Sequence, residues 1–176
     1  PIFHTVENGI LSAATAVLSW PFGISGLIIG GLNQIIVITG VHHVFNMLEI
    51  QLLAEFQSNP YNAIVTCAVA AQGGATLAVA MKTKSTKLTA LGFPSALSAF
   101  LGITEPALFG VNLRYGKPFI MGLIGGAVGG FLASLFQLEA TGMAVTVIPG
   151  TLLYLNGQLL AYILVNLVSI AVAFAL

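Results

Sequence analysis

Residues 8–48 contain no Asp, Glu, Lys or Arg, and this uncharged stretch constrains the fold more than any other feature of the chain. Only 6% of all residues are charged, whereas soluble domains carry about 25%. A helix that spans a bilayer needs about 20 apolar residues, so residues 8–48 are too long for one helix. We therefore expect an all-α membrane protein that crosses the bilayer several times.

Turn signals and isolated charges divide the apolar sequence into segments. The first helix is expected to end or kink at Pro21, and Gln72-Gly73-Gly74 is expected to interrupt the second. The four expected spanning helices are residues 8–20, 61–81, 118–138 and 158–176.

Residues 24–39 are too short to cross the membrane. As a helix they would measure about 24 Å, which is less than the roughly 30 Å hydrocarbon core. The polar pair His42-His43 follows directly after Val41. A re-entrant segment with both histidines near its tip fits this pattern better than a full crossing.

A second re-entrant hairpin is expected between two basic clusters. The first cluster is Lys82, Lys84 and Lys87, which follow residues 61–81. The second is Arg114 and Lys117, which follow residues 88–113. Positive loops favour the cytoplasmic side, so the chain between the clusters should leave and return on one side. Residues 88–113 are too few for two crossings, which need about 40. Glu105 would then lie near the tip of the hairpin.

Two further patterns predict helix packing. Residues 44–56 should form an amphipathic helix, because Phe45, Leu48, Leu52 and Phe56 recur at helical spacing, with Glu49 and Glu55 flanking that stripe. Glycines recur every fourth residue in two registers of residues 118–138. Small residues at this spacing allow membrane helices to approach closely.

Glu105 is the strongest candidate for chemistry. It stands in Gly102-Ile103-Thr104-Glu105-Pro106, a helix break within an apolar region. A charge at bilayer depth costs roughly 2.5–3.5 kcal/mol on insertion scales, so the carboxylate should face an internal polar cavity. It can accept hydrogen bonds from a hydroxylated solute such as a sugar. The alternative is a structural ion pair with Arg114 or Lys117.

Other polar residues are weaker candidates for substrate binding. His42 and His43 stand at a predicted hairpin tip, and consecutive residues do not share a helix face, so one histidine should contact the ligand while the other braces the tip. Gln72 and Gly73 could line the site or mark a kink. Gln34, Asn33 and Asn112 could serve as a pocket wall or as contacts between helices.

The composition excludes several classes of function. Five basic and five acidic residues balance, which argues against nucleic-acid binding. Cys67 is the single cysteine, so an intrachain disulfide framework is excluded and a packing role is expected. Adjacent histidines lack the spacing that aligns two metal ligands on a helix. No metal and no cofactor is expected.

Several motifs, in their order along the chain, carry a resemblance to a known family. They are Thr39-Gly40-Val41-His42-His43, Ala71-Gln72-Gly73-Gly74-Ala75, Lys82-Thr83-Lys84, Pro94-Ser95-Ala96-Leu97-Ser98-Ala99 and Gly102-Ile103-Thr104-Glu105-Pro106-Ala107-Leu108-Phe109-Gly110-Val111-Asn112-Leu113-Arg114. The chain resembles the C-terminal half of the membrane IIC domain of bacterial sugar phosphotransferase systems of the glucose superfamily. Within that superfamily it is most similar to the sucrose class, followed by trehalose and β-glucoside members.

The resemblance implies a homodimeric fold in which residues 1–176 form the sugar-carrying part, with the N-terminal scaffold helices and the IIB domain outside this sequence. Glu105 would hydrogen-bond the sugar and assist proton removal from the hydroxyl that is phosphorylated, and His42 would contact the sugar. Many relatives carry Arg at the position of Gln34, so that contact is in doubt. Cys67 is not in the setting of the phosphocysteine, which lies in IIB.

The sequence therefore predicts part of a multi-pass permease of the bacterial inner membrane, with about four transmembrane helices and two re-entrant hairpins. It would carry a sugar, expected to be sucrose, for phosphorylation by a phospho-IIB domain supplied by IIA and HPr. As an enzyme it would be the membrane part of a protein-phosphohistidine–sugar phosphotransferase, a transferase of the kinase type. The alternatives are a trehalose or β-glucoside permease, an ion-coupled secondary transporter, and a structural module without a solute site.

Overall fold

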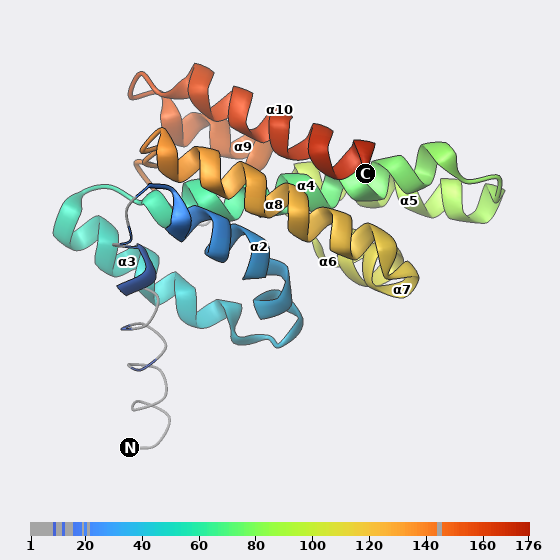
Figure 1. Ribbon diagram of the computed structural model, residues 1–176, viewed down its shortest axis with the longest axis horizontal. Coiled ribbons are helices and arrows are strands. Elements are labelled where there is room, and N and C mark those ends of the chain that lie inside the picture. The colour runs from blue at the N-terminus through green and yellow to red at the C-terminus, as the bar shows by residue number, and fades with distance from the viewer. Residues whose placement is uncertain (1–8, 10–11, 13–15, 19, 21, 144–145) are drawn as a thin grey trace.

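The computed structural model describes residues 9, 12, 16–18, 20, 22–143 and 146–176, and these residues are largely helical (Figure 1). The described part of the chain contains no strand, and its one isolated β-bridge pairs Asn59 with Ala140. The expected all-α class is therefore confirmed. Most of the predicted helix at residues 8–20, and the kink at Pro21, lie outside the described residues.

The helices follow the predicted segments closely. Helix α2 covers Ile24–Ile38, and the 3-10 turn η1 covers Val41–His43. The remaining long helices are α3 (Val44–Phe56), α4 (Pro60–Lys82), α5 (Thr86–Phe100), α8 (Lys117–Leu135) and α10 (Leu159–Ala175). The short elements are α6 (Glu105–Ala107), the π-helical η2 (Leu108–Asn112), α7 (Leu113–Tyr115), α9 (Val147–Gly150) and the 3-10 turn η3 (Thr151–Tyr154).

Helix α4 forms the centre of the structure and packs against α2, α5, α8 and α10. Its start is specified by Asn59, whose side-chain oxygen accepts a hydrogen bond from the Asn62 amide at 3.0 Å, and by Pro60 in the first turn. Among the described residues, α4 and α8 are the helices long and apolar enough to cross a membrane, whereas α2 and α10 are shorter apolar helices. The number of crossings and re-entrant segments therefore stays a prediction.

The expected interruption of α4 at Gln72-Gly73-Gly74 is wrong, because the helix runs through these residues without a break. The glycines instead admit neighbouring helices. A Cβ on Gly73 would lie 2.6 Å from the Phe100 ring of α5, and one on Gly74 would lie 2.7 Å from the Ile170 carbonyl oxygen of α10. The glycine pair therefore reflects close packing on two sides of α4.

The predicted glycine packing is confirmed on α8. A Cβ on Gly126 would lie 2.6 Å from the Gly30 carbonyl oxygen of α2, and a Cβ on Gly130 would overlap the Gly26 carbonyl oxygen. The second register faces α10, where a Cβ on Gly129 would lie 2.6 Å from the Ser169 hydroxyl. Helix α8 therefore contacts α2 and α10 through two different glycine faces.

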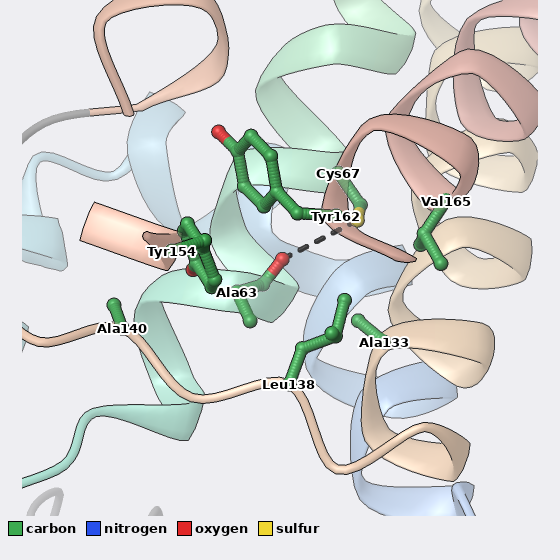
Figure 2. Close-up of a cluster of buried hydrophobic side chains, with 8 residues drawn as sticks. All are labelled: Ala63, Cys67, Ala133, Leu138, Ala140, Tyr154, Tyr162 and Val165. Atoms are coloured by element: carbon green, nitrogen blue, oxygen red, sulfur yellow. Dashed lines mark hydrogen bonds between the residues drawn. The ribbon is translucent and has the colours of Figure 1, made fainter. Parts of the chain in front are cut away.

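Cys67 has the packing role expected from its apolar surroundings. It lies in a buried cluster between α4, α8 and α10, and its sulfur is 3.3 Å from the Ala63 carbonyl oxygen (Figure 2). Tyr154 and Tyr162 belong to the same cluster, and their rings stack with centroids 4.0 Å apart. The tyrosines join the segment after α8 to the centre of the helix bundle.

The two basic clusters meet at one end of the molecule. Lys82 at the end of α4 and Lys117 at the start of α8 line the same groove, which has a volume of about 440 Å³. In Figure 1 this is the end of α5 and α7, whereas α3 lies at the opposite side. The chain between the clusters thus leaves and returns at one end, as the predicted hairpin requires.

Candidate functional site

A polar cavity of about 340 Å³ lies between η1, α3, α4 and the turn that joins α5 to α6. This volume falls in the range of about 300–1,000 Å³ that is typical of ligand pockets. The polar residues of its wall are Asn33, His42, His43, Asn46, Glu49, Tyr61, Asn62, Thr104, Glu105 and Thr146. The cavity therefore brings together four of the predicted site residues, namely His42, His43, Thr104 and Glu105.

The two histidines reach the cavity through a turn that depends on Gly40. This glycine ends α2 with a φ of 75°, in the left-handed region, and its amide donates to the Val37 carbonyl oxygen at 3.0 Å. The imidazole rings of His42 and His43 follow with centroids 4.0 Å apart. Both rings line the cavity, so the expectation that only one contacts the ligand stays untested.

The turn before Glu105 is built in a similar way. After α5, the Ile103 amide donates to the Ser98 carbonyl oxygen at 3.0 Å and the Gly102 amide donates to the Ala99 carbonyl oxygen at 2.9 Å. These two bonds form a Schellman motif, which needs a residue with positive φ at its C′ position. Gly102 supplies it with a φ of 97°. The chain then reverses and places Thr104 and Glu105 at the cavity.

Glu105 is exposed at this turn and lies close enough to His42 for the carboxylate to act on the imidazole electrostatically. The alternative, an ion pair of Glu105 with Arg114 or Lys117, has no counterpart among the contacts of the described residues. Lys117 lines the groove at the other end of the hairpin, and the Arg114 guanidinium lies over the Tyr115 ring. Glu105 thus belongs to the same cavity wall as the two histidines.

Replacing Gly102 with alanine should damage the site while leaving the bundle intact. A Cβ at this position would lie 3.0 Å from the Thr146 hydroxyl, and alanine at positive φ costs on the order of 1–3 kcal/mol. We expect affinity for the sugar that the resemblance predicts to fall at least tenfold in the complete protein. Equilibrium binding of that sugar measures this loss, and Gly110→Ala is the control, because a Cβ there would meet only Leu91, at 3.9 Å. Unchanged affinity would contradict the role of the turn.

Gln72, Gly73 and Asn112 lie outside this cavity. Asn112 Nδ2 donates to the side-chain oxygen of Gln72 at 2.6 Å and to its carbonyl oxygen at 3.0 Å. The Thr76 hydroxyl donates to the Asn112 side-chain oxygen at 2.9 Å. All three side chains are fully buried. This network ties η2, the returning limb of the hairpin, to α4, and a direct role in sugar binding stays a prediction.

We expect the replacement of Asn112 with leucine to lower stability rather than affinity. The change leaves the buried side-chain oxygen of Gln72 without its donor, which costs about 1–3 kcal/mol, whereas the Thr76 hydroxyl keeps the Gln72 carbonyl oxygen as its acceptor. The thermal midpoint of the purified complete protein should fall, while the folded fraction should bind the predicted sugar within about twofold of wild type. A selective loss of affinity without loss of stability would assign Asn112 to the binding site instead.

Gln34 lies apart from both the cavity and the Asn112 network. Its side chain is fully buried in α2, and neither of its amide atoms has a hydrogen-bond partner among the described residues. Asn33, the neighbouring residue, lines the cavity instead. The predicted contact between Gln34 and the sugar therefore has no counterpart in the cavity, and it stays untested.

The structure adds residues to the site that sequence reasoning did not select. Glu49 was expected beside the apolar stripe of α3, but it is 6% exposed and lines the cavity, whereas Phe56 of that stripe is 63% exposed. Asn46 and Asn62 also line the cavity. A usable signal was present, because His42, Asn46 and Glu49 are spaced by four and three residues, which is one helix face.

Comparison with known proteins identifies related chains. The family model described as "Phosphotransferase system, EIIC" matches residues 1–126. The sucrose-specific EIIBC component of the phosphotransferase system of Salmonella typhimurium is 43% identical over 176 residues. The sucrose-specific EIIBC component of Bacillus subtilis (strain 168) is 45% identical over 149 residues, and the trehalose-specific EIIBC component of the same organism is 35% identical over 151 residues.

These matches cover most of this chain but only part of each relative. The Salmonella protein aligns with 99% of this chain, which spans 39% of that protein's length. The two Bacillus proteins each align with 85% of this chain, which spans 32% of their lengths. No solved structure matches the chain.

Proposed function

Because the chain belongs to the phosphotransferase system EIIC family, we propose that it forms the part of a sucrose permease that binds the incoming sugar and presents it for phosphorylation. Family membership, together with two helices long and apolar enough to cross a bilayer, makes the chain a membrane protein. We place it in the bacterial inner membrane as a multi-pass protein, with both basic clusters at the cytoplasmic face.

The cavity that joins Glu105 to the histidine pair is the observation that carries this proposal. Sugars present many hydroxyl donors, and the carboxylate is an acceptor that can take two of them. Neutral imidazoles both donate and accept, so they complement hydroxyls that Glu105 does not reach. Helix α5, at 15 residues, is about 22 Å long from the basic end to this turn. The cavity would therefore lie within the depth of the membrane.

Glu105 has two roles in the proposed reaction. It holds the sugar by charge-assisted hydrogen bonds, which are the strong ones. When a phosphoryl group passes from the phosphocysteine of a IIB domain to a sugar hydroxyl, the sulfur–phosphorus bond breaks and an oxygen–phosphorus bond forms. The hydroxyl proton then passes to the Glu105 carboxylate, and the cysteine leaves as thiolate. This chain supplies the position of the acceptor, which is the proximity contribution to catalysis.

The proposed partners follow from the same scheme. A phospho-IIB domain would receive its phosphoryl group from IIA and HPr, and a second copy of the whole permease would complete a homodimer. Residues 1–176 would be the sugar-carrying part of each subunit. Phosphorylated sugar is charged and cannot return through an apolar barrier, so uptake would proceed in one direction.

Uptake of radiolabelled sucrose by cells that carry the complete permease tests the proposal. We expect uptake to require the phosphorelay and to persist when the proton gradient is collapsed. Unlabelled sucrose should compete better than trehalose or a β-glucoside. Uptake that follows the proton gradient would favour an ion-coupled transporter, and preferred competition by trehalose would reassign the substrate. No sugar binding by the folded permease would leave only a structural module.

A further inference from the structure

We propose that the groove at the basic end of the molecule, where the two basic clusters meet, binds an anionic phospholipid. Lys82 and Lys117 hold its phosphate, and its acyl chains lie along α4. The groove has a volume of about 440 Å³ and shares none of the described residues with the sugar cavity. The inference goes beyond the proposed function, because it requires that the chain lies in a membrane and not that it carries a sugar.

The groove is an apolar hollow where three helices meet. The most buried residues that line it are Ala75 and Ala78 of α4 and Ala173 of α10, none of which is more than 8% exposed. Larger apolar side chains, Met121 of α8 and Phe174 of α10, line it as well and are half-buried. Small side chains thus leave a space that a hydrocarbon chain can fill.

The depth of the groove matches a lipid. Ala75, Ala78, Val79 and Lys82 follow one face of α4 and end at its last residue. Helix α4 has 23 residues and measures about 34 Å, close to the roughly 30 Å of a bilayer core. Lys82 therefore stands at headgroup depth, and Ala75 lies seven residues, or about 10 Å, deeper. A water-soluble protein domain would reach only the outer end of this groove.

Two cations stand at that outer end. Lys82 ends α4 and Lys117 begins α8, and both residues are exposed. Lys82 Nζ donates to the Phe174 carbonyl oxygen of α10 at 3.3 Å and lies 5.5 Å from the centroid of the Phe174 ring. The ammonium therefore lies beside α10, across the groove from its own helix. An ammonium carries three donors, so this bond leaves capacity for a phosphate oxygen.

The charge of this end selects an anionic lipid over a zwitterionic one. All five lysine and arginine residues of the chain lie within residues 82–87 and 114–117, and neither segment contains Asp or Glu. Among the described residues that line the groove, none is acidic. Basic pockets between membrane helices bind anionic headgroups, and basic residues beside the membrane surface attract anionic lipids. The groove thus combines an apolar channel with the charge that such a headgroup requires.

A lipid in this groove would also contact the base of the hairpin that carries Glu105. Leu88 near the start of α5 and Tyr115 at the end of α7 both line the groove. They belong to the outgoing and the returning limb of the hairpin. The lipid would therefore join both limbs to α4, α8 and α10. Because it binds the folded protein, it should raise the thermal midpoint.

Thermal unfolding of the complete permease in detergent, with added phosphatidylglycerol, tests this inference. We expect phosphatidylglycerol to raise the thermal midpoint, and phosphatidylcholine with the same acyl chains to leave it unchanged. The double variant Lys82→Gln/Lys117→Gln should need about 10- to 30-fold more phosphatidylglycerol for the same shift, since each lysine near an anionic headgroup contributes about fivefold. Lys84→Gln/Lys87→Gln is the matched control. It removes two exposed charges from the same end but outside the groove, and it should respond as wild type does.

A second variant tests the apolar part of the site. Val79 is half-buried in the groove, so Val79→Phe should fill the path of the acyl chain while both lysines remain. It should also lose most of the response to phosphatidylglycerol. A full response in Val79→Phe, or an equal shift with inorganic phosphate, would show an anion held at the surface and overturn the lipid site.

Two further results would overturn the site in other ways. Equal losses in the two lysine double variants would show diffuse attraction to the basic end. Binding of phospho-IIB that needs Lys82 and Lys117, without any effect of phosphatidylglycerol, would assign the groove to that domain. Sugar binding enters none of these measurements, so the lipid site and the proposed function stand or fall separately.

Discussion

Replacing Glu105 with glutamine should lower phosphorylation of sucrose by the complete permease at least 100-fold. The substitution keeps the shape of the side chain but removes the charge of Glu105 from the cavity that His42 also lines. In the proposed reaction this weakens the hydrogen bonds to the sugar and removes the proton acceptor, and general-base catalysis alone contributes about 10²–10⁴ in rate. Phosphorylation by purified phospho-IIB in membrane vesicles measures the effect directly.

Glu139→Gln is the control for this experiment. Glu139 follows α8 at the end opposite Lys117 and is exposed, and its main chain, rather than its carboxylate, bonds Gln158 and Asn156. This variant should phosphorylate sucrose at the wild-type rate. Because Glu105 is exposed at its turn, Glu105→Gln should insert and fold normally. A folded Glu105→Gln protein with full activity would remove Glu105 from the reaction.

Helix positions could be predicted from the sequence because their causes are local. Apolar runs define the interiors of α2, α8 and α10, an amphipathic pattern defines α3, and Gly, Pro or lysine residues mark several of their ends. Gln72-Gly73-Gly74 misled the prediction because glycine disfavours an isolated helix, whereas here Phe100 and Ile170 occupy the space that a side chain would take. Contacts of this kind depend on helices distant in sequence, and periodicity does not report them.

The histidine turn and the Thr104-Glu105 turn could each be predicted from the sequence, but their proximity in the folded structure could not. Each half has a local signature, a glycine with positive φ followed within three residues by polar side chains, at Gly40 and at Gly102. Only the tertiary arrangement of η1 and the hairpin turn brings His42 and Glu105 to one cavity. The same packing separates Asn112 and Gln72 from the site. Their polarity suggested a pocket wall, but their hydrogen bonds are directed to each other.

Glu49 shows a different limit of sequence reasoning. Beside Leu48 and Leu52 it appears to be the polar edge of an amphipathic helix, yet it is buried by Asn59 and Asn62 from the start of α4. Asn59 precedes α4 and caps it through the main-chain amide of Asn62, and the further role of both side chains as carboxylate partners depends on a contact distant in sequence. A tertiary contact thus converts an expected surface residue into part of the cavity wall.

Replacing Gly126 with leucine should prevent the permease from reaching its folded state. Any Cβ at this position would lie 2.6 Å from the Gly30 carbonyl oxygen and 3.0 Å from the Ala68 Cα, so the obstacle is backbone on α2 and α4 rather than a movable side chain. Overpacking typically costs about 1–3 kcal/mol, and a clash with two backbones should exceed that range. We expect little folded protein in detergent by size-exclusion chromatography and no sucrose uptake.

Gly110→Leu is the matched control, because Gly110 is helical and a Cβ there would meet only Leu91, at 3.9 Å. Equal yields and thermal midpoints for the two variants would show that α2, α4 and α8 do not approach each other this closely in the membrane.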